Sequence, residues 1–393
     1  MLCRLATALL VCVSLGEAVH NTVNTWNGLL QYDEDWGYVD IRPGAHTFWW
    51  LYAVKPANNR PLILWLQGGP GASSTGFGNF EETGPKMMNS TDNPSTWLQV
   101  ADLVYVDNPV GAGFSYVDND GAFTTNVAEI GQDLLAWLRQ FLILHYEYRT
   151  RPFFIFCESY GGNIRLDFRG VALGDSWISA MDYVNSWGEF LYANSYLDSN
   201  QLARVNAEAK NCQNKVDQGQ WKQATTCWGN MEDLIGTVRE TGGVSWYNIL
   251  KYGGQDDWSK KRRKRSAYSV MNRLFNRHVG FYQRDALSSY MDTTVREKLG
   301  IIPDSVKFGA QSNAVFNMQA EDFMKPNWDT VDSLLKNGTN VIVYNGNQDL
   351  ICDSVGGFHQ SQILIYTRKT MKEKSHICKN PQQRPSAAKN ALL

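Results

Sequence analysis

Short apolar runs alternate along the chain with longer stretches in which apolar residues recur at helical spacing. Between about residues 125 and 142, the recurrence of Val127, Ile130, Leu134 and Leu138 predicts a helix with one buried face. Alternating strands and helices are typical of a mostly parallel sheet flanked by helices. Runs rich in β-forming residues predict buried strands at residues 62–66, 103–106, 153–156 and 341–344.

A more polar region separates the third of these strands from the fourth. Its helical stretches, at residues 180–300, predict a cap inserted into an α/β core. The core then consists of a first part at residues 19–179 and a second part at residues 301–353. The polar residues 354–393 predict a divergent, disordered tail without a strand or a packed helix.

The N-terminus predicts a cleavable signal peptide at residues 1–18. Arg4 precedes an apolar run at residues 5–15 that is too short to cross a bilayer and ends in small residues. No later stretch is apolar and long enough to span a membrane. We therefore expect a soluble chain in the secretory pathway, secreted or lysosomal, where Asn89 and Asn337 begin glycosylation sequons.

Composition narrows the choice of partners only slightly. Of the 393 residues, 43% are hydrophobic, which is enough for one large core with a cap. The formal net charge is -2 and no basic face carries interleaved aromatic residues, so nucleic acid is not expected as a partner. The basic run at residues 260–265 has two interpretations, a solvated loop or a processing site for a protease that cleaves at basic residues.

The cysteines predict one disulfide. Cys3 and Cys12 belong to the predicted signal peptide and are lost with it. Cys212 and Cys227 lie close together in a polar, helical region and are the natural pair. Cys157 adjoins the serine motif described next, and we expect it to be a buried free thiol.

A serine motif follows the third predicted strand directly, at residues 158–162. A serine at a tight turn from strand to helix projects its hydroxyl from the carboxyl end of the sheet, and the next backbone N–H points into an oxyanion site. Ser159 is the serine here, although Cys157 occupies the position where the motif usually has glycine. Paired glycines at the end of the first strand, Gly68 and Gly69, predict further backbone donors for an oxyanion. Asp349 follows the late strand, and the order serine then acid agrees with an α/β-hydrolase.

These stretches together resemble the serine carboxypeptidase family of the α/β-hydrolase fold, most closely its retinoid-inducible branch. The likeness runs from about residue 24 to residue 353 and includes residues 76–82, 107–116, 170–177 and 321–326. The resemblance implies that Ser159 is the nucleophile and that Asp349 orients a histidine. It further implies that the N–H groups of Gly69 and Tyr160 form the oxyanion hole.

The same resemblance assigns the substrate carboxylate to Gln67, Glu82 and Glu158, where Gln67 stands at a position that is asparagine in the family. Two buried carboxyl groups that face a carboxylate must share protons, which raises their pKa and favours an acidic working pH. The family removes single residues from peptide C-termini. No cofactor and no metal are expected.

Two departures from the family pattern affect the prediction. Only residues 163–168 separate the serine turn from the next strand, so the helix behind the turn is expected to be missing in large part. The family's late glycine and histidine turn has no counterpart, and no catalytic histidine is identified. Among the six histidines, His376 and His359 are the two that follow Asp349. The C-terminal part of the core is therefore predicted to be truncated.

The sequence thus predicts a serine-type carboxypeptidase that acts on peptide or protein C-termini through an acyl-enzyme at acidic pH, and that is inactive if the base is absent. Two alternatives stay open, a non-catalytic binder of peptide C-termini and a secreted esterase. The carboxypeptidase and the non-catalytic binder would both require a free C-terminal carboxylate, whereas an esterase would not. A homodimer is also left open.

Overall fold

The computed structural model describes residues 31–55, 59–162, 169–236, 243–252, 269–280 and 285–363. The predicted signal peptide, the basic run at residues 260–265 and Cys378 lie outside these residues. Among the described residues, no helix combines the length and the apolar character that crossing a membrane requires.

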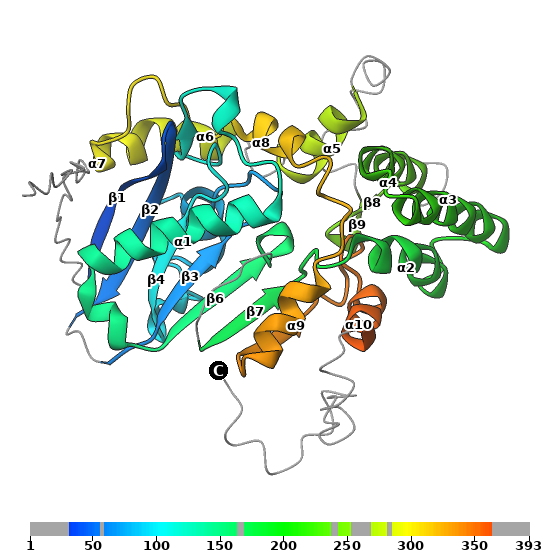
Figure 1. Ribbon diagram of the computed structural model, residues 1–393, viewed down its shortest axis with the longest axis horizontal. Helices are drawn as coiled ribbons and strands as arrows, with labels where there is room; N and C mark the ends of the chain where they lie inside the picture. The colour runs from blue at the N-terminus through cyan, green and yellow to red at the C-terminus, as the bar shows by residue number, and fades with distance from the viewer. Residues whose placement is uncertain are drawn as a thin grey trace, which may run out of the picture.

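A mixed, mostly parallel sheet forms the core in the described part of the chain, with the strand order β1-β2-β4-β3-β6-β7-β10 and the short β5 on β2 (Figure 1). The strands from β4 to β10 run parallel, whereas β1 and β2 form an antiparallel edge. All four predicted strands are confirmed. The bounds are β1 Tyr32–Arg42, β2 Ala45–Val54, β3 Leu62–Leu66, β4 Asp102–Val106, β5 Tyr116–Val117, β6 Phe153–Glu158, β7 Gly170–Gly174 and β10 Asn340–Tyr344.

Helices cover both faces of this sheet, which is why β3 and β4 are buried at every position and read as unbroken apolar runs. On one face, α1 (Val127–Leu144) and α9 (Trp328–Lys336) pack on β3, β4 and β6. The predicted helix is thus confirmed, and the side chain of Asn126 caps its first turn by accepting from Glu129 N. On the other face lie α6 (Asp285–Tyr290) and α7 (Arg296–Leu299).

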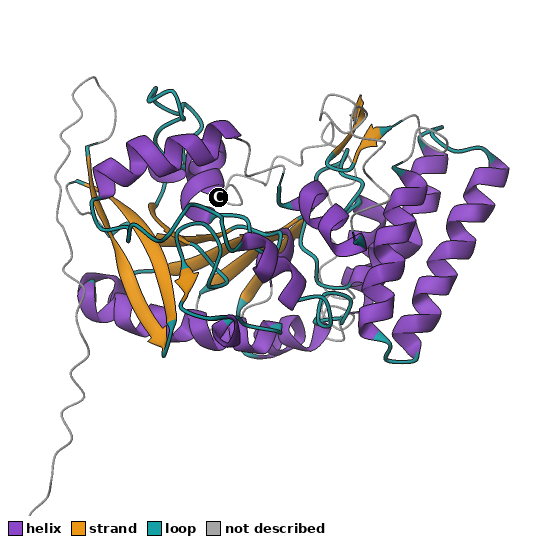
Figure 2. Cartoon of the chain, turned by 90° about the horizontal axis from the view of Figure 1, so that it is seen from above, coloured by secondary structure: helices purple, strands orange, loops and turns teal. Residues whose placement is uncertain are grey.

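A helical cap lies beside the carboxyl ends of β6 and β7 (Figures 1 and 2). Cys212 of α3 and Cys227 of α4 form the predicted disulfide, and Cys157 is a buried free thiol as predicted. The cap shares one apolar cluster with residues at the carboxyl ends of the strands, among them Tyr160 and Ile351. Its elements are α2 Ala180–Ala193, α3 Ser199–Asp217, α4 Trp221–Ile235, β8 Val244–Ser245, β9 Asn248–Tyr252 and α5 Val270–His278.

Two segments differ from the sequence prediction. Residues 285–299 were assigned to the cap, yet Leu287, Met291 and Leu299 pack in the cluster that contains Trp36 and Trp50 of the sheet. Their apolar spacing does not reveal which surface they cover.

The second segment begins the predicted tail. Residues Ser354–Ile363 form the helix α10 where no packed helix was expected. The carboxylate of Asp353 accepts from Val355 N and Gly356 N and so starts this helix, and Gln360 donates to Ser179 O at 3.2 Å. Two glycines within α10 weaken its helical signal in the sequence.

One face of β10 is open in the described part of the chain. Ile342 is 58% exposed and Tyr344 is 42% exposed, whereas Val341 and Val343 on the opposite face pack on the α1 and α9 layer. The side chains on this face of β10, which lies at the end of the strand order, are therefore open to solvent.

Candidate active site

Strand register brings the predicted site residues to one edge of the sheet. Glu158 of β6 pairs with Gly174 of β7, and Gly174 pairs in turn with Tyr344 of β10. The parallel strands therefore end at the same level, and the residues that follow them share the carboxyl edge. Ser159 follows β6 at this edge, and the segment that leads to Asp349 follows β10.

Ser159 occupies a sharp turn immediately after β6. Its backbone φ is 52°, a left-handed conformation that a residue other than glycine adopts at a cost. Its carbonyl accepts a hydrogen bond of 3.0 Å from Trp177 N, which ties the turn to the segment after β7. The turn therefore has the conformation expected of a nucleophile elbow.

The glycine loop after β3 lies directly against this turn. A Cβ on Gly68 would lie 2.6 Å from the Cβ of Ser159 and 3.0 Å from Tyr160 N, so only glycine fits this close approach. Gly69, the next residue, has a φ of +116°. The structure thus packs the glycine loop directly against the turn that carries Ser159 and Tyr160.

Asp107 holds this loop in place. Its buried carboxylate accepts from Ser73 Oγ at 2.7 Å, from Thr75 N at 3.0 Å, from Thr75 Oγ1 at 2.7 Å and from Phe114 N at 2.9 Å. Burial raises the pKa of Asp107, and these four hydrogen bonds oppose that rise. One carboxylate therefore joins the loop after β3 to the loop after β4.

Gln67, Glu82 and Glu158 form a polar cluster beside the nucleophile. Gln67 Nε2 donates to Glu158 Oε2 at 2.7 Å and lies 3.5 Å from Glu82 Oε1. Trp65 Nε1 donates to Gln67 Oε1 at 2.9 Å and fixes the orientation of the amide. Burial raises the pKa of Glu82 well above its usual range, and the charge of Glu158 and a hydrogen bond to it raise it further.

Asp349 lies buried at the same edge and has a carboxylate neighbour. Burial raises the pKa of Asp349 well above its usual range, and the charge of Asp175 adds to the effect. Asp175 follows β7 directly and accepts from Gly346 N at 2.6 Å. Burial raises the pKa of Asp175 to about 6. The charge of Asp175 therefore disfavours the ionisation of Asp349.

Among the described residues, no hydrogen bond joins a histidine to Ser159 or Asp349. His46 and His145 pair with aspartates at the β1 and β2 side of the sheet. His359 is exposed on α10. His278 lies in the cap and faces the site, while His20 and His376 lie outside the described residues.

Side chains of the cap complete the wall around Ser159. The pocket at Ser159 is lined on the core side by Gln67, Gly68, Gly69 and Glu158. The sequence analysis did not assign the rest of the lining to the site. Trp228, Tyr247 and His278 come from the cap, and Trp177, Phe323 and Ile351 come from segments outside the cap elements.

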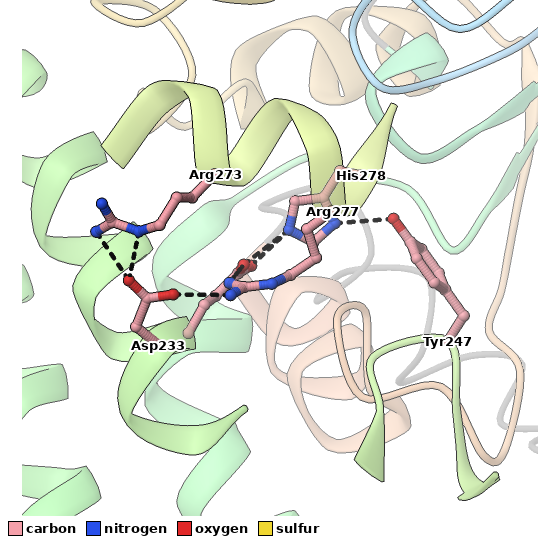
Figure 3. Close-up of polar contacts among 6 residues, drawn as sticks. Asp233, Tyr247, Arg273, Arg277 and His278 are labelled. Atoms are coloured by element: carbon pink, nitrogen blue, oxygen red, sulfur yellow. Dashed lines mark hydrogen bonds and ion pairs between the residues drawn. The ribbon is translucent and has the colours of Figure 1, made fainter. Parts of the chain in front are cut away.

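A buried network of hydrogen bonds and ion pairs includes His278 and Tyr247 of this wall (Figure 3). His278 Nε2 lies 2.8 Å from a carboxylate oxygen of Glu232, and His278 Nδ1 lies 2.8 Å from the hydroxyl of Tyr247. Arg277 pairs with Glu232 at 2.6 Å and with Asp233 at 2.7 Å. Burial acts to lower the pKa of Arg277, but the two carboxylates outweigh it and raise that pKa.

Sequence reasoning missed these residues for different reasons. Asp175 directly follows a strand, and the rule that found Ser159 and Asp349 could have found it too. The cap residues come from separate segments at residues 228, 247 and 278, whose polar surroundings resemble those of any solvated insertion. Only the packing of the cap on the strand ends brings them to the site.

Metal ligation has little support in the described part of the chain. Glu208, Cys212 and Cys227 bring potential ligand atoms close together, but the two sulfurs are bonded to each other. Metal binding by cysteine requires a thiolate, which a disulfide does not offer.

Comparisons with known proteins identify relatives of this chain. A family model described as serine carboxypeptidase matches residues 25–387, and so extends past residue 353, where the sequence analysis ended the likeness. The retinoid-inducible serine carboxypeptidase of Rattus norvegicus is 47% identical over 344 residues, covering 82% of this chain and 75% of that protein. The protein of that name from Homo sapiens is 44% identical with the same coverage. Serine carboxypeptidase-like 51 of Arabidopsis thaliana is 37% identical, covering 88% of this chain and 81% of that protein.

The fold has a counterpart among solved structures. Kex1(Δ)p, a prohormone-processing carboxypeptidase from Saccharomyces cerevisiae, superposes with a TM-score of 0.68 at 20% identity, covering 85% of this chain and 77% of that chain. This likeness shows that the sheet and its helices adopt the α/β-hydrolase arrangement.

Proposed function

Because the chain belongs to the serine carboxypeptidase family, we propose that it binds the free C-terminus of a peptide at Gln67, Glu82 and Glu158 and presents the last peptide bond to Ser159. The observation that carries this proposal is the hydrogen bond between Gln67 and Glu158, which sets an amide and two carboxyl groups immediately beside the nucleophile turn.

The pKa of Glu82 supports recognition of an anion. A carboxyl group that holds its proton can donate a hydrogen bond to a second carboxylate, whereas an ionised one would repel it. Glu82 Oε2 is buried, and the hydrogen bond between Glu82 and Glu158 lets the two carboxyl groups share a proton. With that proton, the pair can donate to a bound peptide carboxylate.

In the proposed reaction, Ser159 Oγ attacks the carbonyl carbon of the last peptide bond. The N–H groups of Gly69 and Tyr160 stabilise the oxyanion, the C-terminal residue leaves with a proton on its amine, and water hydrolyses the acyl-enzyme. Asp349 is the acid that would orient a histidine base. No described histidine is joined to Ser159, so the rate depends on a base from outside the described residues, for which His376 is the candidate.

A titration calorimetry experiment tests the binding step. The Ser159→Ala variant prevents cleavage and is titrated with a peptide that has a free C-terminus and with its amidated twin. We expect the free peptide to bind at least roughly tenfold more tightly, since it alone offers the charged group. Equal affinity for the two peptides would contradict the proposal.

Glu82→Gln in the Ser159→Ala background is expected to change the affinity for the free peptide. Glu81→Gln is the matched control, because Glu81 is the exposed neighbour of Glu82 in the same helix Ser74–Thr83. If the two substitutions had the same effect, Glu82 would have no specific part in binding.

We also propose that the chain matures in the secretory pathway, as a secreted or lysosomal glycoprotein. The apolar run at residues 5–15 supports this, and Asn89 and Asn337 are both exposed. Cells expressing the chain should yield a product that loses mass on treatment with an N-glycosidase. A product that retains Met1 and is insensitive to the glycosidase would exclude this route.

A further inference from the structure

The pocket at Ser159 is narrow. Between the strand ends and the cap, the space that a water-sized group can reach has a volume of about 20 Å³. By this measure, a cavity needs roughly 10–15 Å³ to hold one water molecule. The space at the nucleophile is therefore on the scale of a methyl or hydroxymethyl group and far below that of an aromatic ring.

Aromatic rings of the cap and of the core pack together around this space. Trp228 is 1% exposed and stacks on His278 with ring centroids 5.4 Å apart. It also contacts Phe323 at a centroid distance of 4.5 Å, and Phe323 stacks on Tyr160 with an interplanar angle of 3°. The wall is thus continuous from α4 to the residue that follows the nucleophile.

The ionic network makes this wall difficult to displace. Both ring nitrogens of His278 are engaged, one by Glu232 and the other by the hydroxyl of Tyr247 (Figure 3). Glu232 is fully buried and also accepts from Arg277 at 2.6 Å. Moving the imidazole would leave a buried carboxylate with fewer partners, which is strongly unfavourable.

The same segment touches the oxyanion loop. Val279, the residue after α5, lies so near Gly69 that a Cβ on Gly69 would be 3.0 Å from its Cγ2. The cap therefore contacts both the nucleophile turn and the glycine loop, and its wall is part of the site.

We propose that Trp228, Tyr247 and His278 are specificity-determining residues that restrict the site to substrates with small side chains, such as glycine, alanine or serine, next to the cleaved bond. The inference rests on the proposed binding of peptide C-termini. A bulky side chain would have to displace a wall held by buried hydrogen bonds, and overpacking of this kind is costly.

Tyr247 offers the variant that tests this. It lies in the turn between β8 and β9 and is half-buried, so its truncation removes part of the wall and leaves the helices of the cap in place. Tyr247→Phe keeps the volume but loses the hydroxyl that binds His278, so comparing the two variants separates the volume of the wall from this hydrogen bond. Thermal melts of both variants establish that they are folded.

The experiment measures peptide binding by calorimetry in the full chain with Ser159→Ala. The reference peptide ends in Ala-Ala, and two others carry phenylalanine at the last or at the second-last position. We expect phenylalanine at one of these positions to weaken binding roughly tenfold or more. Tyr247→Ala should restore most of that loss, whereas Tyr247→Phe should not.

Two results would overturn the inference. One is phenylalanine peptides that bind as tightly as the alanine peptide, and the other is an equal effect of Tyr247→Ala and Tyr247→Phe. The amidated alanine peptide separates this outcome from failure of the proposed function. If alanine peptides still bound more tightly than phenylalanine peptides while the amidated and free peptides bound equally, size selection would be supported. Recognition of the peptide carboxylate would be contradicted.

Discussion

The side-chain amide of Gln67 donates a 2.7 Å hydrogen bond to Glu158, the residue that directly precedes Ser159. The amide comes from the end of β3 and the carboxylate from the end of β6, which are neighbouring parallel strands. Since Trp65 fixes the other end of the amide, the pair is set by the sheet itself. The side chains that would hold a peptide carboxylate are therefore positioned by the same pair of strands as the nucleophile.

This arrangement predicts tighter binding of peptide C-termini at acidic pH. Burial and the charge of Glu158 raise the pKa of Glu82, so Glu82 gains its proton as the pH falls and then donates to the peptide carboxylate. We expect affinity for a free C-terminus to increase between pH 7.5 and pH 5, measured by calorimetry on Ser159→Ala. Glu82→Gln should flatten this dependence, and an unchanged pH slope in that variant would show that another group is responsible.

The sequence was sufficient for those parts of the molecule that follow from local pattern. The strands at residues 62–66 and 341–344 are apolar runs with clear ends. Ser159 directly follows β6, and Asp349 lies a few residues after β10. It was not sufficient for the cap side of the site, since Trp228, Tyr247 and His278 converge only through tertiary packing. Helix α10 was missed because its start depends on Asp353, whose capping role shows only in its contacts.

Asp175 should make the protein more stable in mild acid. Its pKa is raised to about 6 by burial, so its contribution to stability is complete below its unfolded pKa near 4 and is lost as the pH rises through about 6. Asp175→Asn removes this loss and should stabilise the fold at pH 7.5 by about 1 to 2 kcal/mol, with partial exposure limiting the effect. Urea denaturation at pH 4 and pH 7.5 measures it. Destabilisation by the variant at pH 7.5 would mean that the carboxylate is needed in its ionised form.

Loss of the Asp107 carboxylate should destabilise the glycine loop and the fold. Asp107→Ala leaves the donors of Ser73, Thr75 and Phe114 buried without their acceptor. We expect a loss of about 3 kcal/mol or more in urea denaturation, together with weaker peptide binding. Asp120→Ala, at an exposed aspartate further along the same segment, should change stability by less than about 0.5 kcal/mol.

The open face of β10 predicts self-association. Strand register places Phe156 of β6, Ala172 of β7 and Ile342 in one row, and Ile342 is 58% exposed. Ile342→Lys should lower binding of an apolar dye and concentration-dependent association in sedimentation, and should raise the secreted fraction in expressing cells. Val343→Lys is the control on the opposite face, and it should instead destabilise the fold by about 2 kcal/mol. If Ile342→Lys left association unchanged, another surface would have to account for it.

Labelling with a fluorophosphonate probe at pH 5.5 measures whether Ser159 has a base. Among the described histidines, His278 is the one that lines the pocket with Ser159, and both of its ring nitrogens are already hydrogen-bonded. Loss of the histidine from a serine triad costs about a factor of 10⁶ in rate, so labelling above the background of Ser159→Ala requires a base from outside the described residues, for which His376 is the candidate. Labelling at background would contradict the proposed reaction, whereas rapid labelling that required Ser159 would place a base at the site. His376→Gln and His278→Gln would then identify it, because only substitution of the base abolishes labelling, while a residue that merely shapes the wall leaves it intact.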